Sequence, residues 1–137
     1  MKNLTLFFVS NGYKLYLDDF RNPRSSYEET KLDIYLKDWV VVRSYNQFIE
    51  RIELAGLPDV VSFDHDLATE HIDYFFMNGG HINPPDPLKA NCEEKTGYDC
   101  AIWLRNYCKS RNLKFPEYLI HSHNPVGAKN IQSICIQ

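Results

Sequence analysis

Lys14-Leu15-Tyr16-Leu17-Asp18-Asp19 is an apolar run that ends in two acidic residues. A second run of the same kind follows later in the chain, Val60-Val61-Ser62-Phe63-Asp64-His65-Asp66. Short runs of β-branched and aromatic residues with polar residues after them are typical of buried strands. The two runs therefore predict two strands, each with carboxylates directly after its last residue.

Two further runs and three helical patterns complete the expected fold. We predict four strands, at residues 14–17, 39–42, 60–63 and 118–120. The spacing of apolar residues predicts helices at 45–55, 96–109 and 128–136. Alternating strands and helices favour an α/β fold with a mainly parallel sheet of four to five strands. In such sheets, functional sites form beyond the carboxyl ends of the strands.

The ends of the predicted strands carry residues that are able to do chemistry. Asp18 and Asp19 follow the first strand, Arg43 the second, Asp64 the third and His121-Ser122-His123-Asn124 the fourth. Because parallel strands end at the same edge of a sheet, we expect these residues to converge there. Convergence from independent strands is stronger support for a site than any one motif.

Three segments fit this pattern less well. Residues 20–38 are long for a bare loop and predict a short helix near 27–36. Residues 68–95 form a long insertion, either a lid over the site or a segment packed on the surface. Residues 1–12 carry a hairpin signal, which predicts an extra edge strand or a loosely attached extension. We expect one domain over 1–137.

Composition narrows the possible partners and the compartment. A net charge of -3 and a pI of about 5.9 argue against a broad basic surface, so we expect no duplex DNA binding. A nucleotide or an RNA end remains a possible ligand. We expect no membrane span, because no apolar segment is long enough. The four cysteines form no Cys-x-x-Cys pair, which indicates a reducing cytoplasm. The sequence carries no signal for an oligomeric state.

The acidic residues predict a metal site. Asp18, Asp19 and Asp64 offer the carboxylate oxygens that Mg²⁺ or Mn²⁺ prefers. Like charges gathered at one sheet edge repel unless a cation, arginines or protonation compensates them. The alternative is that each acid is a solvated loop residue or a helix cap.

Histidines and arginines beside these acids predict proton transfer and phosphate binding. His65 and His121 are the histidines placed at strand ends, and His123 is a weaker candidate. Arg21 and Arg43 are able to bind phosphate oxygens, or they simply pair with the acids.

The segment after the fourth strand offers two more phosphate ligands. Ser122 and Asn124 are able to donate hydrogen bonds to a phosphoryl oxygen. Asn124 precedes Pro125, so a role as a helix cap is the alternative for Asn124.

Five motifs, in this order, resemble the cyclic-phosphate-processing receiver-like domain found in bacteria and their phages. They are Leu15-Tyr16-Leu17-Asp18-Asp19-Phe20-Arg21-Asn22-Pro23, Trp39-Val40-Val41-Val42-Arg43-Ser44, Ser62-Phe63-Asp64-His65-Asp66-Leu67, Thr96-Gly97-Tyr98-Asp99 and His121-Ser122-His123-Asn124-Pro125-Val126-Gly127-Ala128-Lys129-Asn130-Ile131. The resemblance implies a flavodoxin-like, receiver-like three-layer fold. It also implies that Asp18 and Asp19 correspond to the receiver's metal-binding pair, and Asp64 to its phosphoacceptor.

The function expected from the residues and the resemblance together is a metal-assisted phosphoesterase acting on cyclic phosphates of nucleotides or RNA ends. Asp64, His65 and His121 are expected to be catalytic, with phosphate bound by Arg21, Arg43, Ser122 and Asn124. Two alternatives remain. The first is a signalling receiver that is phosphorylated at Asp64, although the receiver's fifth strand and its lysine have no counterpart here. The second is a non-catalytic protein that sequesters a nucleotide.

Overall fold

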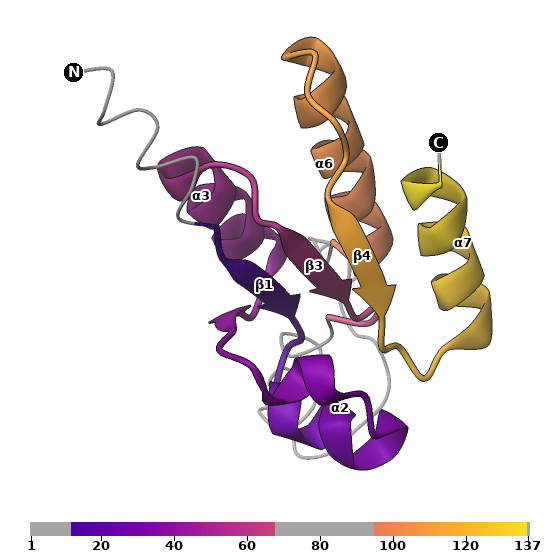
Figure 1. Cartoon of the computed structure of the whole chain (residues 1–137). Coiled ribbons are helices and arrows are strands. Elements are labelled where there is room, and N and C mark those ends of the chain that lie inside the picture. The colour runs from indigo at the N-terminus through magenta and orange to yellow at the C-terminus, as the bar shows by residue number, and fades with distance from the viewer. Residues whose placement is uncertain (1–11, 68–94, 137) are drawn as a thin grey trace, which may run out of the picture.

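The computed structural model describes residues 12–67 and 95–136, and in this part of the chain strands and helices alternate (Figure 1). The elements are β1 (Lys14–Leu17), α2 (Pro23–Thr30), the 3-10 helix η1 (Asp33–Leu36), β2 (Val40–Val42), α3 (Tyr45–Ala55), β3 (Val60–Phe63), α6 (Gly97–Ser110), β4 (Glu117–Ile120) and α7 (Pro125–Cys135). The predicted edge strand within 1–12 and the predicted lid within 68–95 lie outside the described residues, apart from residues 12 and 95.

The strands form one parallel sheet with the order β2-β1-β3-β4. The predicted α/β fold with a parallel sheet is therefore confirmed. Leu17 is in register with Phe63, and Phe63 is in register with Ile120. Because these three residues end their strands, Asp18, Asp64 and His121 are each the next residue at the same edge.

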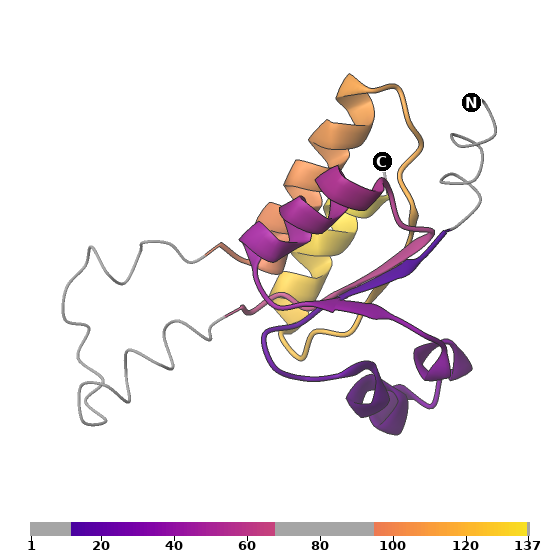
Figure 2. The same ribbon diagram turned by 90° about the vertical axis from the view of Figure 1, so that its left-hand side faces the viewer.

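Helices cover the two faces of the sheet unequally. Helices α3, α6 and α7 lie on one face, whereas α2 and η1 lie on the other (Figure 2). The first face is apolar. Its core includes Leu15, Leu17, Val61 and Phe63 from the strands, and Phe48, Ile52, Leu104 and Ile131 from the helices. Burial of each such side chain contributes about 1.5–3 kcal/mol, so this face supplies much of the stability.

The second face is aromatic and polar. Side chains alternate along a strand, so Tyr16 and Ser62, which are in register, point away from the apolar core. Both are fully buried, beneath Tyr35 of η1 and the neighbouring Trp39. The ring centroids of Tyr35 and Trp39 lie 5.6 Å apart. Tyr16 is two residues before Asp18, so this second face reaches the edge of the sheet that carries the acids.

The predicted helix near 27–36 is wrong in its bounds. Helix α2 begins earlier, at Pro23, because proline is well suited to the first turn of a helix. It ends at Thr30, since Lys31 adopts a left-handed conformation with φ 61°. Residues 33–36 form the separate element η1. At the other end of the chain, Asn124 and Pro125 start α7 three residues before the predicted 128.

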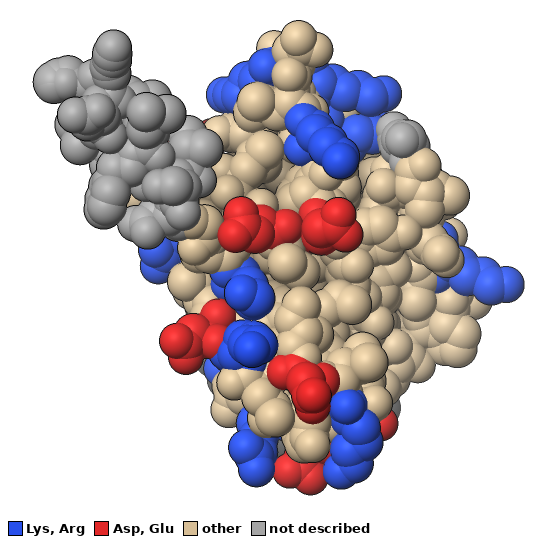
Figure 3. All heavy atoms as spheres, in the orientation of Figure 1, with Lys and Arg blue, Asp and Glu red and all other residues tan. Residues whose placement is uncertain are grey.

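Basic and acidic side chains are interspersed on the face seen in Figure 3, without a continuous basic surface. Within residues 12–67 and 95–136, no helix has both the length and the apolar character needed to cross a membrane.

Candidate functional site

Three carboxylates meet at the carboxyl edge of the sheet. Asp18 and Asp19 directly follow β1, and Asp64 directly follows the adjacent strand β3. Each offers one oxygen, and these three oxygens all lie within 4.8 Å of one another. Asp18 and Asp64 are buried, and Asp19 is half-buried. The convergence expected from the strand ends is thus present for all three acids.

Asp18 is held by four hydrogen bonds. Its Oδ1 accepts from the backbone N–H groups of Phe20 (3.0 Å) and Arg21 (2.8 Å). Its Oδ2 accepts from Arg21 Nε at 3.0 Å and lies 3.1 Å from His121 Nε2. A carboxylate has about four lone-pair positions, so these donors saturate it. Asp18 is therefore fixed in place, and coordination by it requires that one donor be released.

The surroundings of the two buried acids shift their pKa values in opposite directions. Burial raises the pKa of Asp18, but hydrogen bonds from His121, Arg21 and Phe20 outweigh it and hold the pKa at about 2. Burial and the nearby charge of Asp18 raise the pKa of Asp64 to about 7. A cation bound beside these acids would favour the ionised form of Asp64. An all-oxygen group with this charge fits a hard divalent cation such as Mg²⁺ or Mn²⁺.

Arg21 supplies part of the missing positive charge. Its Nε contacts Asp18, and its Nη2 lies 3.3 Å from Asp64 Oδ1. The same Nη2 donates to the carbonyl oxygen of His121 at 3.3 Å. Nη1 lies 3.4 Å from Glu29 Oε1 on α2. The guanidinium group therefore links the ends of β1, β3 and β4, and its side chain is only 14% exposed.

Arg43 contacts the loop that follows β1 rather than the carboxylates themselves. Its Nη1 donates to the backbone carbonyl oxygens of Asp18 (3.2 Å) and Arg21 (2.7 Å). Its Nη2 donates to the side-chain oxygen of Asn22 at 2.9 Å. The sequence offered phosphate binding or pairing with the acids, whereas the structure shows Arg43 bracing the backbone of the loop after β1.

His121 lies inside the protein. Its side chain is 1% exposed, and its two nitrogens contact Asp18 and Ser62. Its ring stacks on that of Tyr16, with centroids 4.3 Å apart. Burial lowers the pKa of His121, although the hydrogen bond to Asp18 opposes this effect. This placement suits a residue that orients Asp18 better than one that meets a substrate.

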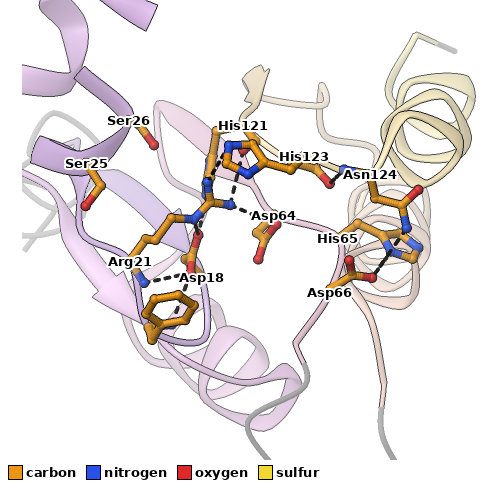
Figure 4. A network of polar contacts seen from close by, with 12 residues as sticks. Asp18, Arg21, Ser25, Ser26, Asp64, His65, Asp66, His121, His123 and Asn124 are labelled. Atoms are coloured by element: carbon orange, nitrogen blue, oxygen red, sulfur yellow. Dashed lines mark hydrogen bonds and ion pairs between the residues drawn. The ribbon is translucent and has the colours of Figure 1, made fainter. Parts of the chain in front are cut away.

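His65 lies in a second group, on the α7 side of the site. Its Nδ1 is 2.8 Å from Asp66 Oδ1, and Figure 4 shows it apart from the group of Asp18, Arg21 and His121. The Nδ2 of Asn124 lies 3.5 Å from the same Asp66 oxygen. The structure therefore does not bring His65 and His121 together as a pair.

The residues after β4 serve mainly local structure. Asn124 Oδ1 accepts from the Gly127 N–H at 2.9 Å and so caps α7. Ser122 Oγ accepts from the Asn124 N–H at 3.0 Å. His123 is 68% exposed, and its Nε2 lies 3.1 Å from Arg21 Nη1 and 3.0 Å from Glu29 Oε1. His123 is thus the histidine with open access to solvent beside Arg21.

The first residues of α6 pack against the backbone of Asp64 and His65. Thr96 caps this helix, with its Oγ1 accepting from the Asp99 N–H at 3.4 Å. The N–H of Gly97 donates to the carbonyl oxygen of His65 at 2.8 Å. A Cβ at residue 97 would overlap the carbonyl oxygen of Asp64. Glycine is required there because the helix approaches the backbone after β3 so closely.

Sequence reasoning missed three residues of the site, Tyr35, Ser62 and Glu29. Ser62 did carry a signal, because it is the one polar residue inside the apolar run Val60-Val61-Ser62-Phe63. Tyr35 and Glu29 carried none, since they reach the site through the fold of residues 23–36.

Comparison with known proteins agrees with this arrangement. A family model described as "Cyclic-phosphate processing Receiver domain" matches residues 13–137. No curated protein and no solved structure gives a significant match. The family match covers β1 to α7 and therefore includes every residue of the acidic edge. The chain belongs to the cyclic-phosphate processing receiver domain family.

Proposed function

We propose that this chain is a metal-assisted phosphoesterase that opens cyclic phosphates of nucleotides or RNA ends. The observation that carries the proposal is the meeting of Asp18, Asp19 and Asp64, with ligand oxygens within 4.8 Å. Membership of the family supports the choice of a cyclic phosphate as substrate. The fold by itself does not, because receiver-like folds carry more than one function.

The three carboxylates would hold Mg²⁺ or Mn²⁺ in this proposal. Asp19 and Asp64 would be direct ligands, and Asp18 would join them by releasing Arg21 Nε while His121 still holds its Oδ2. A bound divalent cation polarises a phosphoryl group or activates a water molecule. Burial, and after it the nearby charge of Asp18, raises the pKa of Asp64 to about 7, and a cation bound between the acids would favour the ionised form.

The remaining side chains would bind the phosphate and move protons. Arg21, which lies beside Asp64, would bind the nonbridging oxygens. His65 and the exposed His123 would exchange protons with the nucleophile and the leaving oxygen. His121 would orient Asp18, while Arg43 would brace the loop that carries both Asp18 and Arg21.

Phe20 supports a nucleotide substrate. It lies between Asp19 and Arg21, and it is 71% exposed. Its backbone N–H donates to Asp18, which fixes its position beside the acids. Exposed aromatic rings next to phosphate sites offer a surface on which a base stacks. Phe20→Ala is expected to weaken the use of nucleotide substrates more than that of small cyclic phosphates without a base.

The signalling alternative rests on the same acids. Asp64 follows β3 beside Asp18 and Asp19, which is the arrangement the receiver resemblance implies for a phosphoacceptor. A small phosphodonor such as acetyl phosphate tests it directly, since a receiver would accept one phosphoryl group on Asp64. Intact mass measurement of the wild-type chain and of Asp64→Asn would detect this.

The decisive experiment for hydrolysis is turnover of 2′,3′-cyclic nucleotides and of RNA with a 2′,3′-cyclic end. We expect product with Mg²⁺ or Mn²⁺, none with EDTA, and loss of product in Asp64→Asn. Asp38→Asn, an exposed acid before β2, is the matched control and should keep wild-type rates. Recovery of tightly bound but intact nucleotide would instead support sequestration and would contradict the proposal.

A further inference from the structure

A continuous chain of buried polar side chains runs beneath the acidic edge. Tyr35 Oη lies 2.7 Å from Ser62 Oγ, which lies 2.7 Å from His121 Nδ1. His121 Nε2 lies 3.1 Å from Asp18 Oδ2. All four residues are at most 5% exposed. The chain joins η1, β3 and the residue after β4 to the residue after β1, so it ties three separate segments to one carboxylate.

The direction of each hydrogen bond in this chain follows from the ionised carboxylate of Asp18 at its end. An ionised carboxylate only accepts, so His121 Nε2 carries the proton and donates it to Asp18. A neutral imidazole then accepts at Nδ1, which makes Ser62 the donor there. Since the Ser62 hydroxyl proton points to His121, its oxygen accepts from the hydroxyl of Tyr35. Every group in the chain is satisfied in this one direction.

Two aromatic rings fix the plane of the imidazole. Tyr16 stacks on His121 with an interplanar angle of 6°. Tyr35 meets His121 edge-on, with an interplanar angle of 85°. The imidazole is thus held by contacts on its face, on its edge and at both nitrogens. Such outer partners of metal ligands commonly set metal affinity by holding the ligand in its binding orientation.

We propose that Ser62 and Tyr35 are positioning residues that act through His121 to hold Asp18 in the orientation needed for divalent cation binding. This inference rests on the metal site of the proposed function and names residues to which that function assigns no role. Ser62 is too deeply buried to meet a substrate, and Tyr35 is 2% exposed.

The same face of the sheet offers a matched control. Ser26 is also fully buried and also contacts a tyrosine hydroxyl, with its Oγ 2.8 Å from Tyr16 Oη. Its hydroxyl has no part in the chain that leads to Asp18. Ser62→Ala and Ser26→Ala therefore remove the same group from similar surroundings, and only the first breaks the proposed connection.

The test is calorimetric titration of the folded chain with Mn²⁺. Ser62→Ala should weaken Mn²⁺ binding about tenfold, at the lower end of what loss of an outer partner costs, and Tyr35→Phe should weaken it less. Ser26→Ala should bind Mn²⁺ as the wild-type chain does. Ser62→Thr, which keeps the hydroxyl, should recover binding relative to Ser62→Ala.

Nitrogen NMR of the histidine rings gives a second readout that needs no metal. His121 in the wild-type chain should carry its proton on Nε2, with a hydrogen-bonded Nδ1. In Ser62→Ala, the Nδ1 signal should move towards that of a free ring nitrogen.

Three results would overturn the inference. Equal losses of Mn²⁺ affinity in Ser62→Ala and Ser26→Ala would show a general effect of a buried hydroxyl. A proton on Nδ1 of His121 would contradict the direction of the chain. Failure of the wild-type chain to bind Mn²⁺ would overturn the proposed function together with this inference, whereas unchanged Mn²⁺ affinity in Ser62→Ala would overturn the inference alone.

Discussion

His121 Nε2 lies 3.1 Å from Asp18 Oδ2, and this contact joins residues 103 positions apart in the chain. Both side chains are essentially shielded from solvent. A hydrogen bond between a buried imidazole and a buried carboxylate is strong because little water competes for either group. Its removal leaves Asp18 with an unmet acceptor position in a place where water cannot easily replace the donor.

His121→Ala is therefore expected to destabilise the fold by about 3 kcal/mol, through the lost bond to a charged group and the lost ring. Urea unfolding in EDTA measures this without a contribution from metal. His123→Ala is the control, because His123 is exposed, and its cost should stay below about 0.5 kcal/mol. Similar costs for the two variants would contradict a structural role for the buried contact.

The raised pKa of Asp64 predicts how stability depends on pH in the absence of metal. The folded chain holds a proton on Asp64 with a pKa of about 7, against the ordinary 3.8. The folded state thus binds this proton more tightly than the unfolded state. The resulting stabilisation is complete below about pH 4 and is lost as the pH rises through about 7.

Asp64→Asn isolates this effect. The stability of the wild-type chain minus that of Asp64→Asn should fall by more than about 2 kcal/mol between about pH 4 and about pH 7, measured in EDTA. His121, with its lowered pKa, titrates in the opposite sense, but both proteins contain it and the subtraction removes it. A difference that stays flat over this range would show that Asp64 is ionised without metal.

In the proposed function, Arg21 would compete with a metal ion for the same acids. Arg21→Gln leaves Asp18 and Asp64 without their guanidinium partner, so we expect a loss of about 3 kcal/mol in EDTA. The gain in stability on adding Mg²⁺ should exceed that of the wild-type chain, because more negative charge remains to be balanced. Turnover should fall, since Arg21 also binds phosphate in the proposed function.

Arg24→Gln is the control for Arg21→Gln. Arg24 pairs with Glu28 on the surface of α2, where both side chains are mostly exposed. Such a pair contributes little, and its loss should change neither stability nor the response to Mg²⁺ appreciably. A smaller Mg²⁺ response in Arg21→Gln than in the wild-type chain would contradict the idea of competition.

The sequence predicts which segments meet, and it does not predict where their side chains point. Apolar runs followed by polar residues are enough to place Asp18, Asp64 and His121 at one edge, because strand ends in a parallel sheet are aligned. The direction of a side chain depends on the pleat and on packing. This is why His65 faces Asp66 and α7, while His121 faces Asp18.

The residues that start and end α2 explain why the predicted bounds of this helix were wrong. Pro23 and the left-handed Lys31 define α2, but a search for apolar periodicity overlooks a helix with so few apolar residues. The buried chain from Tyr35 to Asp18 was hidden for a related reason. Ser62 and Tyr35 each lie between apolar residues, and their contact appears only when η1 packs on β3.

Substitution of Arg43 distinguishes a role in holding the loop after β1 from a role in binding phosphate. Its guanidinium group donates to the carbonyl oxygens of Asp18 and Arg21, and a lysine cannot reproduce that geometry. Arg43→Lys should lower kcat about tenfold, because small displacements of reacting groups are costly, while KM changes less than about twofold. Arg51→Lys on α3 should leave both constants unchanged. A raised KM with unchanged kcat would instead indicate direct phosphate contact.

Gly127 offers a way to move His65 without altering the acids. A Cβ at residue 127 would overlap the His65 ring, so Gly127→Ala should push that ring away from Asp66. If His65 transfers protons, turnover should fall while Mn²⁺ affinity stays at the wild-type value. Unfolding measurements should show a loss of stability, although alanine is ordinarily the better helix residue by about 1 kcal/mol.

A double-mutant cycle shows whether this effect passes through His65. In a His65→Ala background the ring is absent, so Gly127→Ala should become neutral or stabilising, by up to about 1 kcal/mol. The further fall in turnover should also vanish, because the group that was displaced is no longer present. If Gly127→Ala costs the same in both backgrounds, the substitution disturbs α7 itself, and the contact with His65 is not what requires glycine at this position.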